Sequence, residues 1–223
     1  MQLTLDTASI ASLSSAAFSV VVSVFFLGLW LRQKNHLYTD LPLSFGVMFM
    51  AQALNSIIKV LPTLGMLDAS LVLFRIRTIV IFGTVFPLAV VVLHIWLPKA
   101  RARYSRVLGA LTLYWVAVTL FAPSEGLIML FCIPILLVLD IAMIVTFSIT
   151  WRTGRLKEVR SGLMVFAFVL GFLSQLVTSQ VVLDNVLLAL TTAIMTLALI
   201  NPWFRRKHVL IVKPIETTST VSV

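Results

Sequence analysis

The sequence predicts an all-α membrane protein with seven transmembrane helices. Almost the whole chain up to Pro202 is apolar, and 60% of its residues are hydrophobic. Apolar segments of about 18 to 25 residues have the length that a helix needs to cross a bilayer. Seven such segments occur, at about residues 10–31, 41–62, 71–97, 105–121, 127–150, 161–179 and 183–201. We therefore expect a transmembrane domain of residues 1–203 and a cytoplasmic tail of residues 204–223, basic at first and then rich in Thr, Ser and Val.

The distribution of basic residues predicts the orientation of these segments. Of the 17 Lys and Arg residues, 14 follow the first, third, fifth and seventh spans, whereas the segments around Asp68, Glu125 and Asp184 are short and acidic. Cytoplasmic loops carry an excess of Lys and Arg. The N-terminus is thus expected outside and the C-terminus in the cytoplasm, in a prokaryotic plasma membrane. The 14 basic residues are Arg32, Lys34, Lys99, Arg101, Arg103, Arg106, Arg152, Arg155, Lys157, Arg160, Arg205, Arg206, Lys207 and Lys213.

Tryptophan positions agree with this orientation, because tryptophan favours the headgroup level of a bilayer. Trp30, Trp96, Trp151 and Trp203 each lie beside one of the basic segments. Four of the five tryptophans would therefore mark the cytoplasmic boundary.

The first three spans each carry a recognisable feature. No Lys or Arg precedes the first span, so we expect it to remain in the mature protein and not to be a cleaved signal peptide. The second span has Gln52, Asn55, Ser56 and Lys59 at i, i+3, i+4 and i+7, which forms one stripe facing other helices. The third contains Pro87, which removes a backbone hydrogen bond.

The last three spans resemble the first three, with the fourth, the least polar, between them. Trp30-Leu31-Arg32 ends the first span, and Trp151-Arg152 ends the fifth. The third and seventh spans both end in proline beside tryptophan, with arginine following. These similarities suggest a 3+1+3 parallel repeat, a layout that can place a site between two repeats. Any two apolar triplets with interfacial Trp and Arg could also align this well.

Polar residues inside the spans are the first candidates for a functional site, because burying them in lipid is costly. At about 1.5 Å per residue from the cytoplasmic boundaries, several of these side chains lie at depths of about 16 to 21 Å. They are Gln52, Thr84, Asp140, Ser174, Gln175 and Thr191. Asn55 of the polar stripe is added to this group, and Thr191 is left out. The candidate ligand-binding residues are therefore Gln52, Asn55, Thr84, Asp140, Ser174 and Gln175.

Asp140 is the most informative of these residues. A carboxylate near the bilayer centre costs about 2.5 to 3.5 kcal/mol unless it is neutral or paired. No Lys or Arg lies at its depth, so we expect Asp140 to be buried and protonated, with amide and hydroxyl partners. It could be a proton or ligand site, or it could only join helices by hydrogen bonds.

Three cations lie near the outer boundary, against the overall charge bias: Lys59, Arg75 and Arg77. Arg75 and Arg77 are two residues apart and should point to different sides of the helix. They could attract an anionic solute. Contact with outer headgroups and pairing with Asp68 would explain them without a ligand.

Several chemistries have no support in the sequence. The three histidines are not paired within spans, no lysine lies in the last span, and no metalloprotease or phosphate-binding motif occurs. We therefore expect no enzyme activity, no metal and no cofactor. The net charge of +9 is explained by topology and by anionic lipid headgroups, so we do not expect nucleic acid as a partner.

Part of the sequence resembles a known family in layout. The segment from Leu71 to Arg101, with Phe74-Arg75-Ile76-Arg77 and then Phe86-Pro87-Leu88, is similar to the third span of seven-helix sensor modules in prokaryotic histidine kinases. The hairpin before it and the basic residues after the last span are similar as well. In that family a kinase or cyclase domain follows. The layout also resembles the PQ-loop and sugar-transporter group, although neither triplet has a Pro-Gln pair.

The sequence leaves three functions open. We favour a non-catalytic, sensor-like or accessory module that acts through a partner protein in the membrane or the cytoplasm. The alternatives are a small solute transporter that uses the midplane polar residues, and a structural subunit of a larger membrane complex.

Overall fold

The computed structural model describes residues 6–33, 40–97, 101–154, 159–177 and 180–202. All regular secondary structure in these residues is α-helical, which confirms the predicted all-α class. The helices are α1 (Thr7–Leu31), α2 (Leu41–Val60), α3 (Leu71–Trp96), α4 (Arg101–Phe121), α5 (Glu125–Thr153), α6 (Ser161–Leu176) and α7 (Val181–Ile200). Trp203, the predicted tail and several predicted loop cations lie outside the described residues; these cations are Lys34, Lys99, Arg155 and Lys157.

Six of the described helices are long and apolar enough to cross a membrane. The exception is α6, which has 16 residues and is therefore about 24 Å long at 1.5 Å per residue. The hydrocarbon core of a bilayer is about 30 Å thick. The predicted sixth span, residues 161–179, is thus helical only as far as Leu176, and the number of spans stays a prediction.

Side-chain caps explain where several helices begin. Asp6, Ser70 and Ser124 each accept a hydrogen bond from a backbone N–H in the first turn of α1, α3 and α5, which satisfies a donor that the helix leaves free. Hydrogen bonds from Ser9 lower the pKa of the Asp6 carboxyl. At the other end of α5, Gly154 has a φ of 62°, the left-handed conformation that ends many helices.

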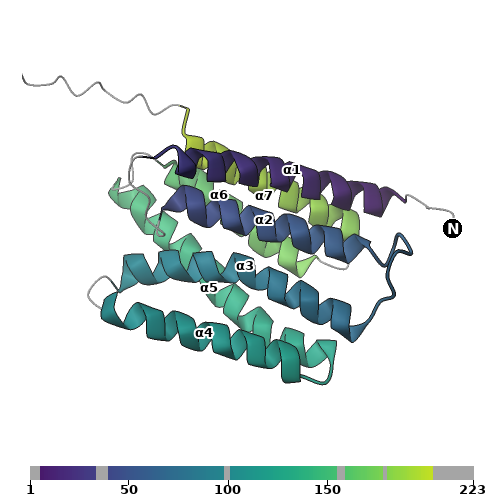
Figure 1. Ribbon diagram of the computed structural model, residues 1–223. Coiled ribbons are helices and arrows are strands. Elements are labelled where there is room, and N and C mark those ends of the chain that lie inside the picture. The colour runs from purple at the N-terminus through teal and green to yellow at the C-terminus, as the bar shows by residue number, and fades with distance from the viewer. Residues whose placement is uncertain (1–5, 34–39, 98–100, 155–158, 178–179, 203–223) are drawn as a thin grey trace, which may run out of the picture.

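Six helices form a ring, and α4 lies outside it (Figure 1). Consecutive helices pack against each other along the chain, and the ring closes through contacts of α3 with α5 and of α1 with α7. Among the described helices, α4 packs mainly on α3 and α5. The chain enters α1 and leaves α7 at opposite ends of the bundle (Figure 1).

We call the end where α1, α3, α5 and α7 finish the basic end. Its described residues include the cations Arg32, Arg103, Arg106, Arg152 and Arg160. The other end, called the polar end, holds Asp68, Glu125 and Asp184, as well as Lys59, Arg75 and Arg77.

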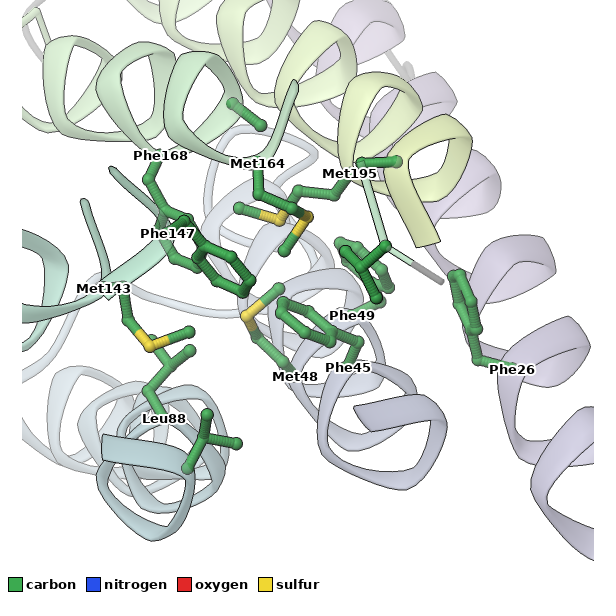
Figure 2. Packing of buried hydrophobic residues seen from close by; sticks show 14 of the residues in the cluster. Phe26, Phe45, Met48, Phe49, Leu88, Met143, Phe147, Met164, Phe168 and Met195 are labelled. Atoms are coloured by element: carbon green, nitrogen blue, oxygen red, sulfur yellow. The ribbon is translucent and has the colours of Figure 1, made fainter. Parts of the chain in front are cut away.

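A core of phenylalanine and methionine fills the ring on the side of the basic end (Figure 2). The rings of Phe147 and Phe168 are stacked with their centres 5.8 Å apart, and Phe45 lies 6.5 Å from Phe168. Methionine is flexible and fills the irregular space between such rings. The cluster includes side chains from every helix except α4: Phe26, Phe45, Met48, Phe49, Leu88, Met143, Phe147, Met164, Phe168 and Met195.

A second, smaller core attaches α4 to α3 and α5. Trp115 is fully buried there with Val85, Ile128 and Cys132. Its indole N–H donates to the backbone oxygen of Thr78 at 2.9 Å. This fifth tryptophan is therefore a packing residue, unlike Trp96 and Trp151, which are exposed at the basic end.

Candidate functional site

The polar stripe of α2 faces neighbouring helices, as its spacing predicts. Gln52 donates its amide N–H groups to Thr192 of α7 at 3.1 Å and to Ser19 of α1 at 3.4 Å. Ser56 is buried. Toward the polar end, Asn55 and Lys59 bind residues of α3 and α7. The stripe therefore joins α2 to α1, α3 and α7.

Asp184 is the centre of a charged cluster at the polar end. The Lys59 ammonium lies 3.0 Å from Asp184 Oδ2, and the two side chains are 26% and 14% exposed. Ser174, in the last turn of α6, donates its hydroxyl to Asp184 Oδ1 at 2.6 Å. Asp184 lies in the first turn of α7 and Lys59 in the last turn of α2, where the helix dipoles favour these charges. The ion pair therefore has both Coulombic and dipole support.

Arg77 extends this cluster to α3. Its Nε donates to Asn55 Oδ1 at 2.7 Å, and its guanidinium carbon lies 5.9 Å from the centre of the Phe74 ring. Arg75 points elsewhere and donates to the backbone oxygen of Ala122 at 3.1 Å. The prediction that the two arginines diverge is confirmed. Arg77 therefore binds a side-chain amide and Arg75 binds a backbone oxygen. These bonds hold the two arginines in place of the expected pairing with Asp68.

Asp140 is buried within the bundle, as the sequence predicts, with an exposed fraction of 7%. It accepts a hydrogen bond of 2.5 Å at Oδ2 from the side-chain amide of Gln175. This bond joins the middle of α5 to the last turn of α6. An amide donor satisfies the carboxyl group without bringing a compensating charge.

The hydrogen bonds do not gather the predicted midplane residues into one site. They form four separate groups of hydrogen-bonded side chains: Gln52 with Ser19 and Thr192, Asp140 with Gln175, Ser174 with Asp184, and Asn55 with Arg77. Thr84 donates to the backbone oxygen of Ile81 in its own helix, and Thr191 Oγ1 is buried without a hydrogen-bond partner. Ser174 and Gln175 lie in the last turn of the short α6, and the bond of Gln175 to Asp140 puts this turn beside the middle of α5.

A buried serine stripe on α1 was not predicted from the sequence. Ser12 accepts a hydrogen bond from the Asn185 amide of α7 at 2.7 Å, and Ser23 donates to the backbone oxygen of Gly46 at 2.7 Å. The stripe consists of Ser9, Ser12, Ser15, Ser19 and Ser23. Its i, i+3 and i+4 spacing was visible in the sequence, and its role is to let helices approach closely.

The described residues offer no obvious metal site, because no group of three or more His, Cys, Asp or Glu side chains is close enough to hold an ion. Protein families, curated proteins and solved structures were compared with the chain, and none matches it significantly. The chemistry of the polar end is therefore the main guide to function: a partly exposed ion pair, an arginine bound to an amide, and hydroxyl donors.

Proposed function

We propose that the chain is a non-catalytic, sensor-like or accessory membrane module that acts through a partner protein. The observation that carries this proposal is the pairing of its intramembrane polar groups with one another. Gln52, Asp140 and Lys59 each bind a side chain of another helix. Such bonds join helices and fix their arrangement.

The two halves of the bundle support a signalling role. The polar end has a charged cluster that links α2, α6 and α7, and the charge bias favours an external position for this end. The other half is closed by the Phe and Met core (Figure 2). A solute that competed for the Lys59–Asp184 pair would alter the packing of α7 on α2, and the change would reach the cytoplasm as a movement of helix ends.

One observation favours a transporter as a second candidate. The contacts within the first triplet, α1 with α2 and α2 with α3, match those of α5 with α6 and α6 with α7 in the last triplet. When the two triplets are exchanged, the α3–α5 contact becomes the α7–α1 contact. This is the pattern expected of the 3+1+3 parallel repeat, and transporters can bind solutes between parallel repeats. Passage of a solute would require the Phe and Met core to open.

A flux experiment separates the two candidates. The purified full chain is placed in liposomes, and uptake of labelled amino acids, sugars and inorganic anions is measured. We expect no uptake above that of empty liposomes. Uptake that is abolished by Gln52→Ala or Gln175→Ala, but is kept in the lipid-facing control Leu113→Ala, would establish transport and overturn the proposal.

A crosslinking experiment tests for the partner directly. A photoreactive amino acid is placed at the exposed positions 113 and 121 of α4 and at the buried position 115 as a matched control. After irradiation of native membranes, we expect one partner protein crosslinked in a fixed ratio from the exposed positions alone. Crosslinks to many abundant proteins, or to lipid alone, would count against a dedicated partner at this face.

A further inference from the structure

A cavity of about 350 Å³ lies between α3, α4 and α5. This volume falls within the range of about 300 to 1,000 Å³ that is typical of ligand pockets. Every side chain that lines it is apolar: Ala89, Val92 and Leu93 of α3, Val107 and Leu111 of α4, and Pro134, Ile135, Val138 and Leu139 of α5. We call this cavity the α4 groove. A ligand that fills it must present hydrocarbon.

The α4 groove occupies one defined depth of the bundle. Val107 and Leu111 lie six and ten residues after the start of α4 at Arg101, or about 9 and 15 Å along the helix axis. Leu93 lies in the last turn of α3, at the same end. On α3 and α4 the lining of the groove therefore reaches from near the basic end to about the middle of a bilayer core about 30 Å thick.

Two arginines of α4 lie near the end of the groove that is toward the basic end. Arg103 precedes Val107 by four residues and Leu111 by eight, so the three share one face of α4. Arg106 is three residues from Arg103 and therefore adjacent to it on the helix surface. Both are exposed. Guanidinium groups bind phosphate oxygens with two parallel hydrogen bonds, so this end of the groove favours an anionic phosphate.

We propose that the α4 groove binds one anionic phospholipid, with an acyl chain between α3, α4 and α5 and its phosphate group on Arg103 and Arg106. The separation of about 6 Å along the axis between Arg103 and Val107 leaves room for the glycerol linkage. A transmembrane helix of a partner protein fits less well. The groove extends along α5 only from Pro134 to Leu139, about 8 Å at 1.5 Å per residue, whereas a spanning helix needs a contact surface of much greater length.

The test is lipid binding to the delipidated full chain, followed by native mass spectrometry in a mild detergent. Phosphatidylglycerol is the anionic probe, and phosphatidylcholine with the same acyl chains is the neutral probe. The double variant Arg103→Gln/Arg106→Gln removes the phosphate contacts, and Val138→Trp fills the groove from an exposed position of α5. Matched controls are Arg32→Gln/Arg152→Gln, which removes two exposed charges at the same end, and Leu113→Trp, on the exposed side of α4 away from the groove.

We expect one phosphatidylglycerol to bind at least about tenfold more tightly than phosphatidylcholine. The double arginine variant should lose this preference, Val138→Trp should weaken both lipids, and both controls should behave as wild type. Equal binding of the two lipids, an equal loss in Arg32→Gln/Arg152→Gln, or full binding in Val138→Trp would each overturn the proposal. If Val138→Trp does not fold, Leu111→Phe fills the same groove from α4 and gives the same test.

Discussion

At the level of single residues, Asp184 is where three helices meet. It accepts hydrogen bonds from Lys59 of α2 and Ser174 of α6 while lying in the first turn of α7. Partly buried ion pairs stabilise a fold when both partners are present, but they leave a costly charge behind when one is removed. The effect of a substitution here should therefore depend on which charge remains.

Lys59→Met should lower the free energy of unfolding by about 1 to 3 kcal/mol, because it removes the cation paired with the Asp184 carboxylate and leaves that carboxylate with the hydrogen bond from Ser174. The double variant Lys59→Met/Asp184→Asn should recover part of this loss, because it removes both charges. Reversible unfolding in mild detergent with increasing SDS measures Lys59→Met, Asp184→Asn and the double variant. Additive effects of the two single substitutions would mean that the pair does not contribute as a pair.

Asp140 should respond differently, because its partner is the neutral amide of Gln175. Asp140→Asn keeps the shape of the side chain and an oxygen that can accept this hydrogen bond. We expect a change of less than about 1 kcal/mol in the free energy of unfolding, measured by the same SDS titration. A loss as large as that of Lys59→Met would indicate that a charged carboxylate is needed in the fold.

At the level of helices, a close approach of α2 and α3 depends on a glycine. A Cβ atom added at Gly83 would lie 2.7 Å from the Cβ of Ala51, which is too short for two methyl groups. Small residues of this kind let membrane helices pack closely.

Gly83→Ala should therefore destabilise the α2–α3 pair by about 1 to 3 kcal/mol, the usual cost of overpacking. The matched control is Gly109→Ala in α4, where an added Cβ meets nothing within 4 Å and helix propensity should give up to about 1 kcal/mol of stabilisation. Thermal unfolding of both variants, followed by circular dichroism, tests the difference in sign. Equal effects would show that the two glycines occupy similar surroundings.

Most helix boundaries could be predicted from the sequence, because polar caps and basic loops interrupt long apolar runs. The predicted span of residues 71–97 differs from α3 by one residue, and the predicted span of residues 41–62 differs from α2 by two. The early end of α6 was not predicted, because the apolar composition continues to Val177 and no proline or glycine marks the end at Leu176.

The site was predictable only in part. Helical spacing alone showed that the polar stripe of α2 faces other helices, and that Arg75 and Arg77 diverge. The partners could not be read from spacing, because they depend on which helices are neighbours in three dimensions. Asp184 was counted as an outer loop charge, and only the packing of α7 near α2 brings it to Lys59.

At the level of the whole molecule, the interior changes character along its axis. The Phe and Met core (Figure 2) fills the half toward the basic end, and the charged cluster lies at the polar end. Anionic headgroups attract basic segments on the cytoplasmic side, so we expect the charge distribution to orient the closed half inward. The polar end would then face the exterior, where a solute could reach Lys59 and Asp184.

This orientation requires all seven helices to cross the membrane, and the short α6 is the decisive one. We expect a reporter after Val223 to be cytoplasmic and one at Met1 to be external, because 14 of the 17 basic residues follow the first, third, fifth and seventh predicted spans. In a Cys132→Ser background, an impermeant maleimide should label Gln180→Cys in intact cells but Thr153→Cys only after permeabilisation. If α6 did not cross, positions 153 and 180 would share the cytoplasmic side, α7 would run outward, and the reporter after Val223 would be external. A short α6 can still span, because bilayers thin locally around short helices at a cost of fractions of a kcal/mol per Å of mismatch, so we expect the seven-span result.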